Sequence, residues 1–264
     1  MDKVLLSGNE AIARGAYEAG ARMCSAYPGT PSTEIFENLP QFKDALYCEW
    51  APNEKVALEV AYGASIAGAR SLCAMKHVGL NVAADPMFTA GYNGVSGGFV
   101  IVTADDPSMH SSQNEQDNRR YAMAAKIALV EPSDSQECKD FIAEAYRISE
   151  LFDTPVLFRT TTRVSHSKSL VELGQRQERE PFAYKRDLAK NSCAPALAYA
   201  KRPKVEKRLE DLAEYGCTSP LNRVEMGDGK VGVISASIAY EYAKEVFPEG
   251  TSFFHGPERR RKHG

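Results

Sequence analysis

The sequence predicts an α/β fold in which a parallel sheet carries helices on both of its faces. From the start of the chain to about residue 159, short apolar runs alternate with longer segments of helical spacing, which is typical of such a sheet. Several of these runs are continuously apolar, as expected for strands covered on both sides. Strands are predicted at 22–26, 46–50, 71–75, 97–103, 127–130 and 155–159.

The segments between these strands predict the helices. The segment 134–150 follows a capping cluster at Ser133–Glu137, and its apolar side chains recur at helical spacing. The segment 53–68 opens on Asn53 and Glu54 and carries a face of small residues, which predicts close packing in a core or at an interface. The predicted helices are 9–20, 32–38, 53–68, 79–90, 115–124 and 134–150.

The chain changes character after a first domain at 1–165. Residues 166–229 interleave basic and acidic side chains with prolines, so we expect a charged, solvated linker rather than a face for nucleic acid. The α/β pattern restarts at 230–254, which predicts the start of a second α/β domain. The last segment, 255–264, is polar and basic and predicts a tail. Because it cannot complete a βαβ unit, we expect a truncation or a frame change there.

Composition argues against several classes of function. The 264 residues carry a net charge of -3 at pH 7, with a pI near 6.0, so neither nucleic acid nor an anionic membrane is a favoured partner. No apolar stretch is long enough for a signal peptide or a membrane span, and we expect a cytoplasmic protein. The six cysteines include no C-x-x-C pair. We therefore expect no metal site and no iron–sulfur cluster in this chain.

Two features at predicted strand ends suit a ligand. The loop after the strand at 22–26 contains Gly29, which allows close backbone approach, and Thr30, which supplies a hydroxyl. Glu54 opens the helix after the next strand. Because open α/β sheets bind ligands at the carboxyl ends of their strands, we expect Thr30 and Glu54 to share a site. The structural alternatives are a plain turn with Ser32 as a helix cap, and a first-turn acid favoured by the helix dipole.

Three further residues are site candidates. His77 follows the predicted strand at 71–75, and it is either a donor to the substrate or a hydrogen-bonded loop histidine. Arg119 and Arg120 follow a polar segment, and either guanidinium suits a substrate carboxylate. Since the two arginines are adjacent, the sequence leaves open which of them faces the site.

Five segments of the chain match the motifs of a known family. These are Leu6–Ala11, Tyr27–Ser32, Asn53–Ala57, Lys76–Asn81 and Ser111–Asp117. On these residues the chain, over about 3–254, resembles the thiamine-diphosphate-dependent 2-oxoacid ferredoxin oxidoreductases, most closely the alpha subunits of the indolepyruvate type. The resemblance implies that 1–165 is the domain that receives the aminopyrimidine ring of thiamine diphosphate.

The resemblance also implies roles for single residues. Glu54 binds a pyrimidine nitrogen and promotes the imino tautomer that activates the cofactor, with Gly29 and Thr30 also on the cofactor side. Thr30 lies near the substrate, His77 assists catalysis, and Arg119 or Arg120 binds the substrate. The implied reaction is oxidative decarboxylation of an aryl 2-oxoacid such as indolepyruvate to an acyl-coenzyme A, with electrons passed to ferredoxin.

The family further implies partners that this chain does not contain. Diphosphate and Mg²⁺ are expected to bind a missing or partner domain, a beta subunit completes the oxidoreductase, and 4Fe-4S clusters are expected only in a full-length subunit. We therefore expect this chain to be inactive alone. Two alternatives stay open: a family member that acts on pyruvate or another 2-oxoacid, and a non-catalytic α/β binding or assembly module.

Overall fold

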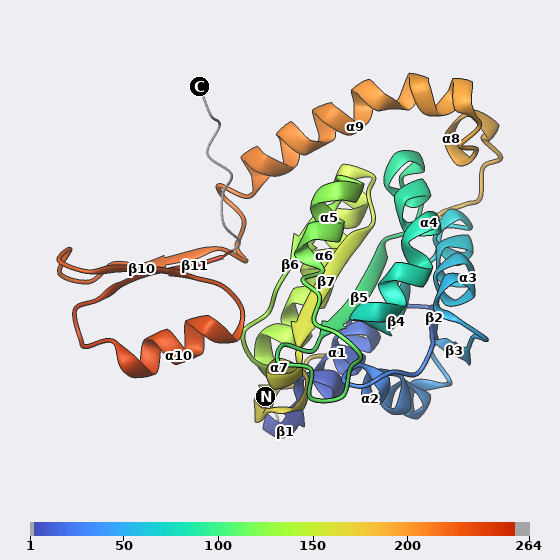
Figure 1. Cartoon of the computed structure of the whole chain (residues 1–264). Coiled ribbons are helices and arrows are strands. Elements are labelled where there is room, and N and C mark those ends of the chain that lie inside the picture. Colours follow the sequence, from blue (N-terminus) through green and yellow to red (C-terminus); the bar gives the residue numbers. More distant parts are fainter. Residues whose placement is uncertain (1–2, 257–264) are drawn as a thin grey trace.

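A parallel sheet forms the centre of the computed structural model, which describes residues 3–256. In this part of the chain six strands pair in the order β3-β2-β4-β5-β7-β6, and every neighbouring pair is parallel (Figure 1). The strands are β2 (Met23–Ala26), β3 (Tyr47–Trp50), β4 (Ser71–Lys76), β5 (Phe99–Asp105), β6 (Ala128–Val130) and β7 (Val156–Thr161). Each begins and ends close to a predicted strand, so the predicted fold class is confirmed.

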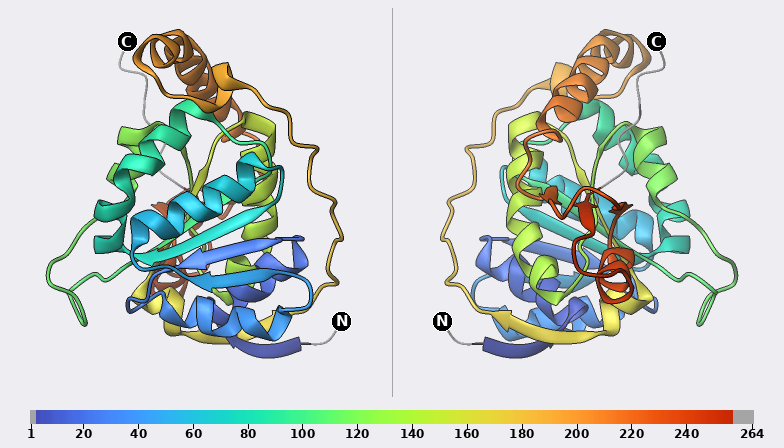
Figure 2. Two further views of the ribbon diagram at one scale, coloured as in Figure 1. Left: turned by 90° about the vertical axis from the view of Figure 1, so that its right-hand side faces the viewer. Right: turned by 90° about the vertical axis from the view of Figure 1, so that its left-hand side faces the viewer.

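The strands are connected by helices that cover both faces of the sheet. These are α1 (Gly8–Glu18), α2 (Thr33–Asn38), α3 (Glu54–Ile66), α4 (His77–Asn93), α5 (Arg119–Ala125), α6 (Ser135–Phe152) and α7 (Thr162–His166), with a 3-10 helix, η1 (Leu39–Phe42). Helices α1, α2 and α6 pack on one face, and α3, α4 and α5 pack on the other (Figures 1 and 2). Helix α5 starts later than predicted, because the carboxylate of Glu115 accepts the amide of Ser108 within the preceding loop (2.7 Å).

The alternation of side chains along each strand explains the continuous apolar runs. In β4, Leu72 and Ala74 belong to the core beneath α1 and α6, whereas Cys73 and Met75 belong to the core beneath α3 and α4. All seven residues of β5 are buried. Because both faces of the sheet are covered, successive side chains of a central strand are apolar regardless of the face to which they point.

The remaining elements lie outside the central sheet. They are β1 (Lys3–Ser7), β8 (Lys168–Glu172), α8 (Leu188–Asn191), α9 (Pro195–Tyr215), β9 (Arg223–Glu225), β10 (Gly232–Ser235), α10 (Ile238–Val246) and β11 (Ser252–His255). Strand β1 pairs antiparallel with β8, and β11 lies between β10 and β9. Helix α9 passes across one end of the molecule, next to α4 (Figure 1). Within residues 3–256 we find no helix with both the length and the apolar character that a membrane crossing requires.

The segment 166–229, expected as a solvated linker, is partly held against the first domain. The Arg176 guanidinium donates to the carbonyls of Tyr17 and Ala21 near the end of α1, and Arg208 donates to Gly91 in the last turn of α4 (2.7 Å). Carbonyls in the last turn of a helix lack intrahelical partners and attract cations. The expectation of full solvation is therefore wrong for these two basic side chains.

The predicted boundary at residue 255 also needs a correction. His255 is buried and ends strand β11 in register with Ser235, so it belongs to the folded part of the chain and not to a tail. Residues 257–264 of the predicted basic tail lie outside the described residues.

Candidate active site

Three loops meet at the carboxyl edge of the sheet. Strand β2 lies between β3 and β4, so the loop after β2, the start of α3 after β3 and the start of α4 after β4 are neighbours. The chain leaves β2 toward β3 on one side and returns to β4 on the other, which is the topological switch point where open α/β sheets bind ligands. These loops carry Gly29 and Thr30, Glu54, and His77 respectively.

The loop after β2 is held by its own hydroxyl groups. The Gly29 amide donates to Thr33 Oγ1, while the amide and the hydroxyl of Ser32 both donate to the Gly29 carbonyl (2.8 Å in each case). The side chain of Ser32 therefore makes no capping bond to α2, and the predicted cap is wrong. Thr30 is exposed at the tip. Asn9 supports the loop from within, because its buried amide donates to the Pro31 carbonyl (2.7 Å).

The carboxylate of Glu54 is held by packing. Glu54 is the first residue of α3, and the side chain of Asn53 caps this helix by accepting the Val56 amide (2.9 Å). The side chain of Glu54 lies against Gly79, where an added Cβ would stand only 2.6 Å from Glu54 Oε1. Burial, together with the charge of Glu54, raises the pKa of Cys73 beneath it. Within residues 3–256 no hydrogen bond or ion pair engages the Glu54 carboxylate, so both oxygens are available as acceptors.

The start of α4 lies between these two groups. The methylene stem of Lys76 fills the space beside Gly29, where an added Cβ would stand 2.9 Å from Lys76 Cδ. The Lys76 ammonium donates to the carbonyl of Ser111 (2.9 Å). His77 is completely buried, and its Nε2 lies 3.0 Å from the carbonyl of Asn114. Of the two alternatives left open for His77, the structure shows the hydrogen-bonded histidine, and direct contact with a substrate does not fit its burial.

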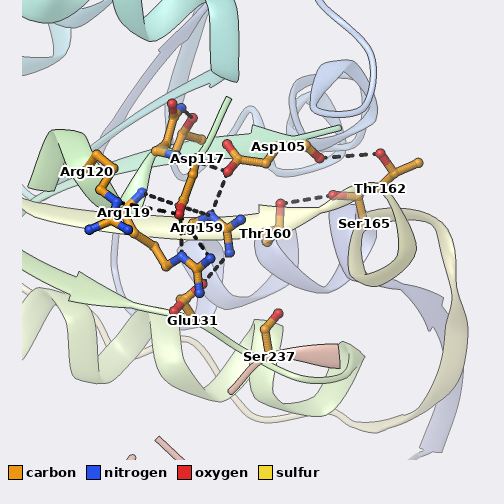
Figure 3. A network of polar contacts seen from close by, with 12 residues as sticks. Asp105, Asp117, Arg119, Arg120, Glu131, Arg159, Thr160, Thr162, Ser165 and Ser237 are labelled. Carbon is orange, nitrogen blue, oxygen red and sulfur yellow. Dashed lines mark hydrogen bonds and ion pairs between the residues drawn. The ribbon is translucent and has the colours of Figure 1, made fainter. Parts of the chain in front are cut away.

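The two predicted substrate arginines lie beside Asp117 (Figure 3). The guanidinium of Arg119 donates twice to the carboxylate of Asp117 (2.8 and 3.0 Å), which raises the pKa of Arg119. Arg120 lies 4.0 Å from Asp117, with 76% of its side chain exposed. Both arginines line a cavity of about 870 Å³ between α5, β6 and the start of α10, and the walls of this cavity contain neither Thr30 nor Glu54.

A buried polar network behind these residues escaped the sequence analysis (Figure 3). Arg159 Nε donates to Asp105 Oδ2 (2.7 Å), and its Nη1 pairs with Glu131. Burial alone would lower the pKa of Arg159, but the carboxylates of Asp105 and Glu131 raise it. Burial raises the pKa of Asp105 in spite of the arginine beside it. Arg159 ends the predicted strand at 155–159, and a charged residue in an otherwise apolar strand was the sequence signal for this network.

Asp106, the residue after β5, anchors the loop that follows. Its carboxylate accepts the amide of Ser111 (2.8 Å) and the hydroxyls of Ser112 (2.7 Å) and Thr162 (2.8 Å). Burial alone would raise the pKa of Asp106, but these hydrogen bonds lower it to about 2. Two adjacent aspartates directly after a predicted strand were the signal for this anchor. Within residues 3–256 no group of three or more His, Cys, Asp or Glu side chains is arranged to hold a metal ion.

Comparison with known proteins identifies relatives of this chain. Residues 14–213 match the family model described as pyruvate flavodoxin/ferredoxin oxidoreductase, thiamine diphosphate-binding. The chain is 50% identical to the indolepyruvate oxidoreductase subunit IorA of Archaeoglobus fulgidus and 47% identical to that of Methanothermobacter thermautotrophicus. Each match covers 93% of this chain, but only 41% and 40% of the relatives. The chain thus spans about two fifths of their length.

The fold recurs in a solved structure. The 2-oxoglutarate:ferredoxin oxidoreductase from Magnetococcus marinus superposes with a TM-score of 0.77 at 16% identity, covering 97% of this chain and 54% of that one. At this identity the superposition shows a shared fold. Because the family model matches residues 14–213, which is most of this chain, the chain belongs to the family of pyruvate flavodoxin/ferredoxin oxidoreductase thiamine-diphosphate-binding domains.

Proposed function

We propose that this chain supplies the pyrimidine side of the active site in a thiamine-diphosphate-dependent 2-oxoacid oxidoreductase. The observation that carries the proposal is the Glu54 carboxylate, which lies against Gly79 at the carboxyl edge of the sheet and has no hydrogen-bond or ion-pair partner among the described residues. When bound, thiamine diphosphate supplies the nucleophilic carbon and accepts the electrons released by decarboxylation. The free carboxylate and the glycine cradle beside it fit a ligand whose ring nitrogen carries a proton.

The side chains of this site have separate tasks. Glu54 accepts a hydrogen bond from the protonated ring nitrogen and so fixes both the orientation of the ring and the position of that proton. Gly29 brings the backbone of its loop close to the cofactor, and the exposed hydroxyl of Thr30 donates to the carboxylate or the oxo group of the substrate. Asn9 and Thr33 hold this loop in place. Contact of Arg119 or Arg120 with the substrate carboxylate stays a prediction, and both side chains line a cavity whose walls do not include Thr30 or Glu54.

The names of the relatives support an aryl 2-oxoacid such as indolepyruvate as the substrate. Coenzyme A as acyl acceptor, ferredoxin as electron acceptor and a beta subunit complete the proposal. Pyruvate or another 2-oxoacid is the alternative substrate, and turnover of the assembled enzyme with each acid separates them. A cytoplasmic location stays a prediction.

Since the chain spans about two fifths of its relatives, we assign the diphosphate, its Mg²⁺ and any 4Fe-4S clusters to other parts of the enzyme. Residues 1–165 are then the pyrimidine domain, 166–229 a connection and 230–254 part of a second domain. The outward face of α3 includes Gly63, beside which there is open space. This face of small residues is our candidate contact for the domain that binds the diphosphate.

Substitution of Glu54 tests the proposal. Glu54→Gln keeps the size of the side chain but removes the charge, and we expect the exchange of the thiazolium C2 proton to slow by about 10²- to 10⁴-fold in the assembled enzyme, as measured by NMR. The free energy of unfolding is expected to change by less than about 0.5 kcal/mol. Glu210→Gln, at an exposed carboxylate on α9, is the matched control. C2 exchange near the wild-type rate in Glu54→Gln would remove the basis of the proposal.

A further inference from the structure

The loop after β5 is an ordered part of the carboxyl edge. This segment, Pro107–Asp117, is called the 107–117 loop here; it is the green loop that leaves the body of the molecule in Figure 2. At its base Asp106 binds the loop at Ser111 and Ser112. Glu115 closes the loop on itself by accepting the amide of Ser108 (2.7 Å). These bonds give the loop a defined shape, but none of them fixes its position relative to Thr30 or Glu54.

Two side chains at the start of α4 bind the 107–117 loop and fix its position. Lys76 Nζ donates to the Ser111 carbonyl (2.9 Å), and His77 Nε2 contacts the Asn114 carbonyl (3.0 Å). Because a carbonyl oxygen only accepts, the proton of the second bond lies on Nε2. His77 Nδ1 is buried without a partner, so the contact with Asn114 is the one polar bond of this side chain within residues 3–256.

The segment 76–79, which includes Lys76 and His77, also contacts the Thr30 loop and Glu54. The stem of Lys76 packs beside Gly29, and Gly79 makes room for Glu54. The start of α4 is therefore the element to which the Thr30 loop, the Glu54 carboxylate and the 107–117 loop are all attached. The Thr30 loop, Glu54 and the 107–117 loop follow different strands. Loss of the contact between any one of them and α4 would therefore change its distance from the other two.

We infer that Lys76 and His77 are positioning residues that hold the 107–117 loop as the substrate-side wall of the site, an inference that rests on the proposed function. His77 acts from within the core and Lys76 acts across the surface. Neither touches the reacting atoms. Loss of either bond loosens a wall that binds substrate and transition state alike, and such uniform binding appears in KM rather than in kcat.

Amide hydrogen exchange of the purified protein tests the attachment directly. We expect exchange in the 107–117 loop to be about tenfold faster in Lys76→Met and in His77→Ala, the effect of losing one hydrogen bond, while α6 keeps its protection. Lys76→Met retains the stem beside Gly29. His77→Gln places an amide donor near the Asn114 carbonyl and is expected to restore protection. Lys207→Met removes an exposed lysine–carboxylate pair on α9 and is the matched control.

Turnover of the assembled enzyme with indolepyruvate tests whether the 107–117 loop forms the substrate-side wall of the site. The expected result is a KM raised about tenfold in Lys76→Met, with kcat within about twofold of wild type and no effect of Lys207→Met. Unchanged loop exchange in both Lys76→Met and His77→Ala would overturn the inference, and so would faster exchange with an unchanged KM. If the wild-type assembly turns over no 2-oxoacid, the proposed function fails, while the exchange measurement still decides whether the two residues hold the loop.

Discussion

Substitution of Gly79 by alanine separates stability from function at this site. Gly79 lies in the first turn of α4, and alanine is favoured over glycine in a helix by up to about 1 kcal/mol. The added Cβ would lie 2.6 Å from both Oε1 and Cγ of Glu54, so this side chain has to retreat by roughly 0.8 Å to reach ordinary contact at 3.4 Å. Because the Glu54 side chain has several rotatable bonds and no hydrogen bond or ion pair within residues 3–256 holds its carboxylate, we expect the retreat to cost little stability.

The same retreat is expected to remove most of the activity. A misplacement of about 1 Å in a positioned group costs on the order of 10²-fold in rate, so Gly79→Ala should bind thiamine diphosphate weakly and turn over slowly. Unfolding in urea, followed by the fluorescence of Trp50, which is the one tryptophan of the sequence, measures stability. Calorimetric titration with thiamine diphosphate and Mg²⁺ in the assembled enzyme measures binding.

A matched glycine provides the control. Gly216 caps the end of α9 with φ −57°, and an added Cβ there meets its nearest atom at 3.4 Å, so Gly216→Ala should keep full cofactor affinity and gain up to about 1 kcal/mol. Unchanged cofactor affinity in Gly79→Ala would show that the position of Glu54 does not matter. Destabilisation by more than about 2 kcal/mol would show that Glu54 cannot move aside.

Two further predictions concern the buried charges. The pKa of Asp106 is about 2 against an ordinary 3.8, which implies that the ionised carboxylate stabilises the fold by about 2 kcal/mol. This contribution is complete above about pH 4. It is lost as the pH falls toward 2, because the carboxyl group of the unfolded chain takes up its proton at a higher pH than that of the folded chain. Urea unfolding between pH 2 and 6 is expected to lose this dependence in Asp106→Asn, and an identical profile would contradict the assignment. Arg159→Met leaves Asp105 and Glu131 buried without their cation and is expected to cost about 3–5 kcal/mol. Arg120→Met, at an exposed side chain, is expected to cost less than about 0.5 kcal/mol, and equal costs would refute the role of the network.

The pattern of the sequence was sufficient for the central sheet. Strands covered on both sides require consecutive apolar residues, and this requirement is local, so their positions follow from the sequence alone. The rule that parallel strands present their carboxyl ends at one edge also predicts a shared site for Thr30 and Glu54, and the strand order puts their loops after the neighbouring strands β2 and β3. Two of the segments that match the family, Tyr27–Ser32 and Asn53–Ala57, lie at these strand ends, and they indicated the cofactor.

Contacts between distant parts of the chain were decided only by the tertiary structure. Strands β1 and β8 pair although Lys3 and Glu172 lie far apart in the sequence, and no local pattern specifies such a pairing. His77 carries the sequence signals of an active-site residue, yet the Asn114 carbonyl and the covering loop bury it. Lys76 opens the matching segment Lys76–Asn81, but nothing in the sequence shows what its side chain contacts. It joins two walls of the site because strand order brings β5 beside β4, and strand order depends on how all the apolar faces are buried together.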